Sequence, residues 1–211
     1  AKFFIRRGRL SVDGTVVTDP EFDLADTSSV VFDGKSISIA GFQYIVLHKP
    51  PRYACAVKDG EHPSVLTLLN SRSDNRYFYF ANVLGPDASG LVLLSDDARW
   101  TQRVKRRLLK KPRVYRATLK DAINDAQLEQ LKDRLQAAGD GKSGTASDVR
   151  AHDGDTLTIE MGQTGTQDLL KTCEAVGLTI RALHLQQLGR LTLGDLREGD
   201  YAELAEDDVK I

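Results

Sequence analysis

The chain has 211 residues, of which 41% are hydrophobic and 28% charged, and its formal net charge is −1. This balance is typical of a soluble globular protein and argues against a wholesale electrostatic binder of nucleic acid. No run of residues is long and apolar enough to span a membrane, and the N-terminal AKFFIRRGRL lacks the apolar stretch of a signal peptide, so we expect a cytoplasmic protein with no membrane partner.

The first 41 residues predict short strands joined by tight turns. AKFFIRRG is typical of the end of a helix that is stopped by Gly8. RLSVDGTVV predicts a hairpin that turns at Asp13-Gly14, and SSVVFDG predicts another short strand that ends at Asp33-Gly34. We expect Lys35–Phe42 to be a linker, with the domain boundary between residues 41 and 42.

Strand and helix signals then alternate irregularly, which predicts an α+β fold. Strands are predicted at QYIVLHKPP, RYFYFANVL, GLVLLSDD, RVYRATLK, DTLTIEMG, TIRALHLQQLGRLTLGDL and GDYAEL. Helices are predicted at HPSVLTLLN, with Pro63 in its first turn, and at 97–109, with Trp100, Val104 and Leu108 on one face. A third follows a capping box formed by Asn124 and Gln127, and a fourth is TQDLLKTCEAVG.

Two segments, 1–9 and 99–116, contain basic residues and no acidic ones. Such a segment is either a solvated surface or a surface that holds phosphates. Lys49, which ends a predicted strand, is a further candidate for a phosphate contact. The candidate phosphate-binding residues are Lys2, Arg6, Arg7, Arg9, Lys49, Arg103, Lys105, Arg106, Arg107, Lys110, Lys111 and Arg113.

The cysteines and histidines give no sign of a metal site or a cofactor. Cys55 and Cys173 lie far apart among apolar neighbours, so we expect two reduced thiols in or near the core. The four histidines show no spacing typical of metal ligands. We therefore expect no metal and no cofactor.

The stretch ANVLGPDASG, residues 81–90, predicts a tight loop between two strands. A loop of this kind can direct a side chain into a cleft. The residue best placed to do so is Gly85, which has no side chain.

Several segments, taken in their order and spacing, resemble the bacterial ribosomal-RNA pseudouridine synthases. FIRRGRLSVDGTVVTDPEFDL is similar to the second half of the alpha-L RNA-binding motif that precedes the catalytic domain in that family. Three further segments resemble blocks of the catalytic domain: YIVLHKPPRYACAVKDGEHPSVLTLL, VYRATL and CEAVGLTIRALHLQQLGRLTLGDLREGDY.

The resemblance implies a partial alpha-L motif and linker at 1–41 and a pseudouridine-synthase-like domain at 42–211. The second domain is then expected to have a mixed, mostly antiparallel sheet with flanking helices. The resemblance also implies a monomer that binds structured RNA, ribosomal RNA in the first place.

The resemblance also exposes departures from the family pattern. It places the family's catalytic Asp at Gly85 and the neighbouring Arg at Val83, and it places the active-site Tyr at Tyr115. In the family the Asp acts on a flipped-out uridine, and glycine supplies neither a nucleophile nor a base. The cation that accompanies the Asp falls at Leu170, and its loss is consistent with the loss of the anion because an unpaired buried cation costs free energy.

Three interpretations remain open. The first, which we favour, is an RNA-binding protein that has lost the isomerase chemistry. The second is an active pseudouridine synthase that uses a displaced acid such as Asp87, which is otherwise interpreted as a turn residue. The third is a protein-interaction module with little RNA affinity. Tyr115 is expected either to stack on a base or to be a half-buried strand residue.

Overall fold

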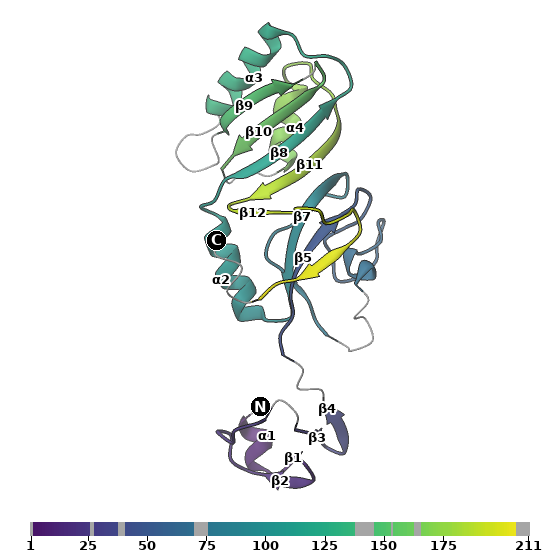
Figure 1. Ribbon diagram of the computed structural model, residues 1–211, viewed down its shortest axis with the longest axis vertical. Helices are drawn as coiled ribbons and strands as arrows, with labels where there is room; N and C mark the ends of the chain where they lie inside the picture. Colours follow the sequence, from purple (N-terminus) through teal and green to yellow (C-terminus); the bar gives the residue numbers. More distant parts are fainter. Residues whose placement is uncertain are drawn as a thin grey trace. The chain divides into compact units, whose positions relative to one another are not determined.

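The computed structural model describes residues 2–25, 28–37, 41–69, 76–137, 146–152, 154–162 and 166–205. The chain divides into two compact units, Ala1–Phe42 and Gln43–Ile211 (Figure 1). The predicted boundary fell between 41 and 42, and the division between the units falls one residue later. In the part of the chain described, no helix has the length and apolar composition needed to cross a membrane.

The first unit is a four-stranded antiparallel sheet preceded by one short helix, and its strand order is β2-β1-β3-β4. Its elements are α1 (Lys2–Arg6), β1 (Leu10–Val12), β2 (Thr15–Val17), β3 (Val30–Phe32) and β4 (Lys35–Ile37). The predicted hairpin is confirmed, because Asp13 and Gly14 form its turn with φ of 49° and 81°. Positive φ at both central residues is the geometry that Asp-Gly favours.

The linker prediction is wrong at its start. A second Asp-Gly turn, at Asp33-Gly34, pairs Phe32 with Lys35, so Lys35–Ile37 forms β4. All three residues of this strand are exposed. A strand with no buried face needs no alternation of apolar and polar residues, so this one could not be predicted from such a pattern. The rest of the predicted linker includes 38–40, which lie outside the described residues.

The second unit is a nine-stranded sheet with the order β13-β5-β7-β11-β8-β10-β9, in which β6 pairs with β7 and β12 with β11. Its strands are β5 (Tyr44–Lys49), β6 (Tyr79–Phe80), β7 (Ala88–Ser95), β8 (Arg113–Leu119), β9 (Ala146–His152), β10 (Thr156–Met161), β11 (Ile180–Leu188), β12 (Leu191–Thr192) and β13 (Tyr201–Glu203). Among the described strands, β7 and β11 form the single parallel pair. The predicted mixed, mostly antiparallel sheet is confirmed.

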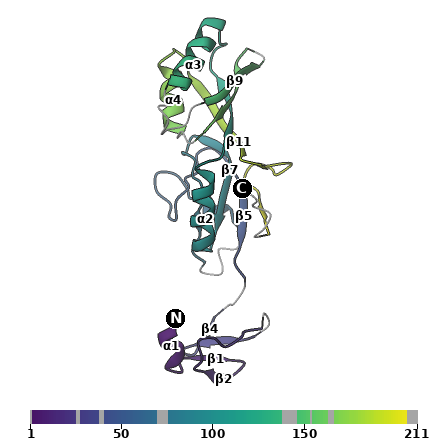
Figure 2. The same cartoon turned by 90° about the vertical axis from the view of Figure 1, so that its left-hand side faces the viewer.

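Helices cover one side of this sheet. They are the 3-10 helix η1 (Val65–Leu68) and the α-helices α2 (Ala98–Leu108), α3 (Asp125–Ala137) and α4 (Thr166–Glu174). Figure 2 shows α3 and α4 together on the same side of strands β9 and β11. The apolar faces of the strands and helices meet in one core that includes side chains from β5, β7, β8, β10 and β11.

The predicted amphipathic helix is confirmed as α2. Trp100, Val104 and Leu108 are buried, and the Asp97 side chain accepts hydrogen bonds from the Arg99 and Trp100 amides at the N-terminus. Burial of each large side chain contributes about 2 kcal/mol to stability. The other sides of α2 are therefore left to its polar and basic residues.

Two other helix predictions have different outcomes. The capping box before α3 is confirmed, since Asn124 and Gln127 exchange backbone-to-side-chain hydrogen bonds of 3.2 and 2.9 Å. Pro63 does not lie in the first turn of its helix. Instead Ser64 caps η1 by accepting a hydrogen bond from the Leu66 amide, which places Pro63 before the cap.

Strand β9 was not predicted. It pairs with β10, and within its described side chains only Val149 is buried, while Arg150 and His152 are exposed. One buried residue does not produce a recognisable period of two, so the strand depends on its partner rather than on its own pattern.

Candidate functional site

The loop within residues 81–90 leads into strand β7 at the point where β7 pairs in parallel with β11. Ala88, Ser89 and Gly90 face Leu183, His184 and Leu185, respectively. Gly90 has φ of 120°, and a Cβ atom there would lie 2.3 Å from the Leu185 carbonyl oxygen. Only glycine tolerates both the backbone conformation and this close approach. The two strands therefore meet backbone to backbone at the end of the loop.

Hydrogen bonds fix the loop at both ends. Asn82 is buried; its Nδ2 donates to the Leu91 carbonyl at 2.9 Å and its Oδ1 accepts from the Leu93 amide at 2.8 Å. Within the loop, the Ala88 amide donates to the Gly85 carbonyl at 3.2 Å. These bonds hold residues 82–88 as a defined turn rather than a loose connection.

Lys49 supports the loop from inside. Its side chain is fully buried, and its Nζ donates to the carbonyls of Pro50, Pro86 and Ala88 at 3.0, 3.1 and 2.5 Å. Burial lowers the pKa of Lys49 to about 8. We expected Lys49 to contact phosphate, and this prediction is wrong in the structure because the ammonium is enclosed and already bonded to the backbone.

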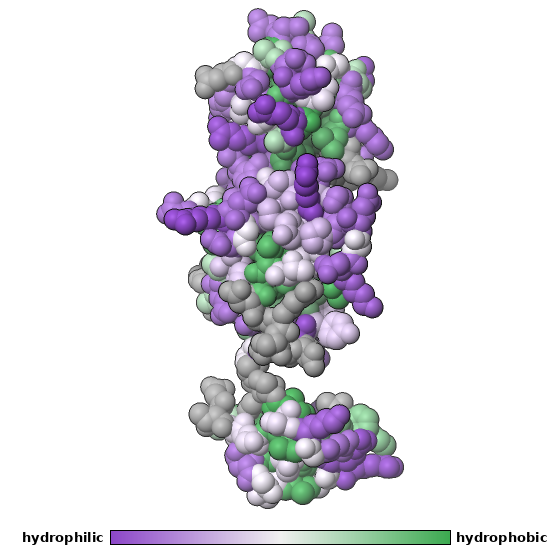
Figure 3. Space-filling model, turned by 90° about the vertical axis from the view of Figure 1, so that its right-hand side faces the viewer, coloured by the Kyte–Doolittle hydropathy of each residue, from purple (hydrophilic) through white to green (hydrophobic). Residues whose placement is uncertain are grey.

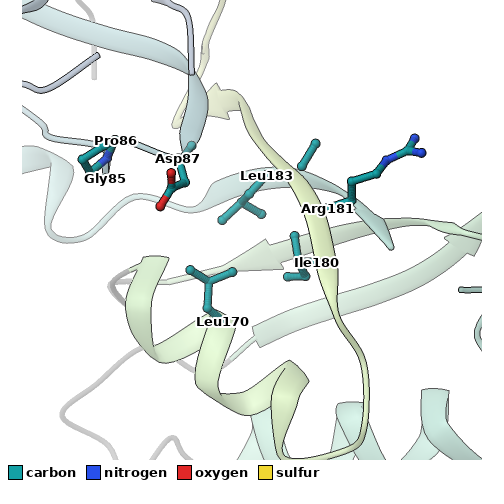
Figure 4. Close-up of a pocket in the computed structure, with 9 residues that line it drawn as sticks. Gly85, Pro86, Asp87, Leu170, Ile180, Arg181 and Leu183 are labelled. Carbon is teal, nitrogen blue, oxygen red and sulfur yellow. The ribbon is translucent and has the colours of Figure 1, made fainter. Parts of the chain in front are cut away.

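A pocket of about 100 Å³ opens beside the loop (Figure 4). One wall is the loop itself, residues Gly85–Ala88, and the other comes from residues 180–183 of β11 together with Leu170 of α4. Gly85 contributes backbone only. Leu170, where the resemblance places a cation, is an apolar side chain in the wall of the same pocket.

Asp87 is the acidic side chain in this pocket. In Figure 4 the Asp87 carboxylate lies between Pro86 and Leu183, above Leu170, while the guanidinium of Arg181 points away from it. Among the described residues, no hydrogen bond or ion pair is made by the exposed Asp87 carboxylate, although its charge partly opposes the lowering of the Lys49 pKa by burial. The pocket therefore combines apolar walls with one anionic side chain whose hydrogen-bond acceptors are unused.

Tyr115 does not reach this pocket. It is 3% exposed, it belongs to the core, and it is absent from the residues that line the pocket. Burial raises the pKa of its hydroxyl, with a smaller opposite effect from Arg113. The structure therefore places Tyr115 in β8 as a buried core residue, more deeply buried than the half-buried strand residue of the second interpretation, and its stacking on a base stays a prediction.

Sequence reasoning missed a cluster on β5, β7 and β11. The Ser89 Oγ lies 2.9 Å from His184 Nδ1, and the His184 ring lies 5.2 Å from that of His48. Burial lowers the pKa of His184, and His48 and Arg116 lower it further. His48 pairs through Nδ1 with the Leu196 carbonyl at 2.8 Å. His48 and His184 are 136 positions apart, and only the pairing of the strands brings them together, so no local sequence pattern predicted this cluster.

The second basic segment forms an exposed surface on and after α2. We define the α2 basic surface as the exposed cations Arg99, Arg103, Lys105, Arg106, Arg107 and Lys110. No acidic residue lies within α2. Lys111 and Arg113 are half-buried, and Arg113 donates to the Gly162 carbonyl at 3.2 Å, so these two are less available to a ligand.

The first basic segment is partly neutralised. Lys2 pairs with Glu21 at 2.7 Å, Arg9 pairs with Asp33, and Arg7 lies over the ring of Phe3 at 4.6 Å. Arg6 is exposed. Figure 3 shows hydrophilic and hydrophobic groups side by side on one face of this unit. Both acids, Glu21 and Asp33, lie in later turns of the chain, so the acid-free stretch alone did not predict these ion pairs.

The two cysteines are free, with Cys173 buried and Cys55 half-buried, as predicted for core or near-core thiols. Burial raises the pKa of Cys173 to about 12 and also raises that of Cys55. A raised pKa keeps a thiol protonated and unreactive at neutral pH. Neither thiol is therefore a candidate nucleophile.

Comparison with known proteins agrees with this fold. Residues 43–168 match the sequence model of the family described as RNA pseudouridylate synthase. Ribosomal small subunit pseudouridine synthase A of Escherichia coli K12 is 30% identical over 209 residues, covering 97% of this chain and 89% of the relative. The enzyme of the same name from Vibrio cholerae is 28% identical over 206 residues, with coverage of 97% and 89%.

A crystal structure of a pseudouridylate synthase has the same fold, with a TM-score of 0.67 at 20% sequence identity, covering 99% of this chain and 90% of that one. The family model spans more than half of the chain, and the relatives align along nearly all of it. The chain therefore belongs to the RNA pseudouridylate synthase family.

Proposed function

We propose that this chain is an RNA-binding protein that keeps the pseudouridine-synthase fold without the isomerase activity. The observation that carries the proposal is the composition of the pocket. Gly85 stands in the wall where the resemblance requires a carboxylate, and Leu170 stands where it requires a cation. Without these two side chains the pocket lacks the family's nucleophile and the cation that keeps it ionised, and the carboxylate that does line the pocket, Asp87, lies two positions further along the loop.

The RNA that we propose as ligand is that of the small ribosomal subunit. The relatives from Escherichia coli and Vibrio cholerae are named for that substrate and align with almost the whole chain. The α2 basic surface supports the proposal, since exposed arginines and lysines on a helix that contains no acidic residue are suited to phosphate contacts. In this proposal the first unit, as an alpha-L motif, makes a second contact through Arg6 and Arg7.

Binding is expected to weaken steeply with salt. With about four phosphate contacts, affinity falls about 100-fold between 50 and 200 mM salt, because each contact releases a condensed counterion. The variant Lys105→Ala/Arg106→Ala/Arg107→Ala is expected to bind weakly at 50 mM salt and to have a shallower salt dependence. Filter binding to small-subunit rRNA measures both quantities.

A matched control removes three cations from elsewhere in the same unit: Lys120→Ala/Lys132→Ala/Arg134→Ala. This variant has the same net charge as the α2 variant, so equal losses in the two would show that only overall charge matters. An affinity that hardly changes with salt would contradict the assignment of the α2 basic surface as the contact.

The isomerase is tested by mapping new pseudouridines in small-subunit rRNA from cells that lack the modification, using carbodiimide and primer extension. We expect the wild-type chain to produce no new site under conditions in which the Escherichia coli relative does. Salt-sensitive binding of the same RNA must be present in parallel. A new site would contradict the loss of chemistry.

One alternative has an observation in its favour. The Asp87 carboxylate lies in the same pocket as Gly85, so an active synthase that uses this displaced acid is the second candidate function. Under it, a new pseudouridine appears with the wild-type chain and disappears with Asp87→Asn. Under our proposal neither the wild-type chain nor Asp87→Asn produces a new pseudouridine.

A further inference from the structure

We infer that the pocket beside Gly85 binds a guanine base of a single-stranded or looped RNA, with the Asp87 carboxylate accepting hydrogen bonds from the base. The inference rests on the proposed function, because it supposes that the chain binds RNA without reacting with it. The inference adds which base of the bound RNA occupies the pocket.

The hydrogen-bonding capacity of the pocket comes from Asp87. No described residue is bonded to its carboxylate, and the Arg181 guanidinium is directed away from it in Figure 4. The charge of Asp87 interacts with that of Lys49 at the end of β5, but the Lys49 Nζ donates its hydrogen bonds to three backbone carbonyls. The carboxylate oxygens thus remain as hydrogen-bond acceptors for a ligand.

An ionised carboxylate only accepts hydrogen bonds, and its two oxygens can accept two parallel donors. The Watson–Crick edge of guanine presents two adjacent donors, N1–H and N2–H. Uracil presents one N–H between two carbonyl oxygens, which the carboxylate repels. Adenine and cytosine present one amino group next to an unprotonated ring nitrogen. Guanine is therefore the base that matches Asp87 with both oxygens.

The remaining walls suit one face and edge of an aromatic ring. Leu170, Ile180 and Leu183 provide apolar surface facing the loop (Figure 4). An apolar cavity of about 150 Å³ takes a benzene-sized ring, and this pocket, at about 100 Å³, is smaller. We therefore place only the Watson–Crick edge of guanine in the pocket, beside Asp87, and leave the five-membered ring and the ribose outside it.

The test uses the full chain and four labelled RNA pentamers that differ only at the central base: UUGUU, UUAUU, UUCUU and UUUUU. Fluorescence anisotropy at low salt measures the four affinities. We expect UUGUU to bind about tenfold more tightly than UUUUU, since a bidentate pair discriminates by about that much. Asp87→Asn is expected to reduce this preference to about twofold or less, because an amide offers one donor and one acceptor.

Asp121→Asn is the matched control. Asp121 is an exposed acid of the same unit outside the pocket, so its substitution makes the same change in charge and should leave the guanine preference intact. Equal affinity for the four pentamers, with small-subunit rRNA still bound in a salt-sensitive manner, would overturn the guanine pocket and leave the proposed function standing. Failure to bind any RNA would overturn both.

Discussion

Replacement of Gly90 by alanine is expected to destabilise the second unit by about 3–5 kcal/mol. The added Cβ would lie 2.3 Å from the Leu185 carbonyl oxygen and 2.6 Å from the Leu185 amide nitrogen, and both contacts are with backbone that cannot rotate away. The φ of 120° adds strain for any residue with a side chain. Urea unfolding followed by far-ultraviolet circular dichroism measures the loss.

Gly85→Ala in the same loop is the matched control. Gly85 is not among the glycines with positive φ, so a methyl group there adds no backbone strain, and the residue lines a pocket. We expect a change within about 1 kcal/mol for this variant. If Gly90→Ala were equally mild, the close approach of β7 and β11 at Leu185 would not exist in solution.

Replacement of Lys49 by methionine is expected to lower the free energy of unfolding at pH 7.5 by about 2–4 kcal/mol. Methionine fills a similar volume but leaves the carbonyls of Pro50 and Ala88 without their Nζ donor. The loop that forms one wall of the pocket then loses its internal support. Lys58→Met, at an exposed position, is the control and should have little effect.

The same variant reveals a pH dependence. The folded chain releases the Lys49 proton at a pKa of about 8, whereas the unfolded chain holds it up to its ordinary value of 10.5. The unfolded state therefore binds more protons between these values, so this group makes stability rise with pH across that window. Stability of the wild type relative to Lys49→Met should increase from pH 7.5 to pH 9.

The comparison between the two chains is needed because other groups act in the opposite direction at higher pH. Burial raises the pKa values of Cys55, Cys173 and Tyr115, so each of them lowers stability once its unfolded counterpart begins to ionise. Cys173 and Tyr115 are the same in both chains and cancel in the difference. Cys55 interacts with the Lys49 charge and does not cancel, so the comparison is made with Cys55→Ser in both chains. A difference that stays constant from pH 7.5 to 9 would contradict the lowered pKa of Lys49.

Local signals in the sequence were sufficient for much of the fold. The turn at Asp13-Gly14, the apolar stripe of α2 and the capping box at Asn124 each depend on residues within a few positions of one another. Strands β4 and β9 were missed because their structure depends on pairing with a neighbouring strand. Their own residues show no apolar alternation.

The candidate site was predicted only in part, for a related reason. Gly85 and Leu170 were recognised through the family resemblance, and both line the pocket. The enclosure of Lys49 could not be predicted, since a lysine at a strand end is usually exposed and its three acceptors lie one, 37 and 39 residues away. The contact between Ser89 and His184 could not be predicted either, because it requires the parallel pairing of β7 and β11.

The strand order also constrains the sequence of events in folding. Residues of β11 complete the pocket at the Gly85 loop. Strand β13 pairs with the edge of β5, so residues near 45 cannot complete their hydrogen bonding until residues near 202 are available. Contacts of such long range form slowly, because a large loop must close before they contribute. As the chain leaves the ribosome, β5 and β7 can pair early. The pocket itself is complete only after residues 180–183 of β11 have been synthesised, so the last fifth of the chain determines when the pocket forms.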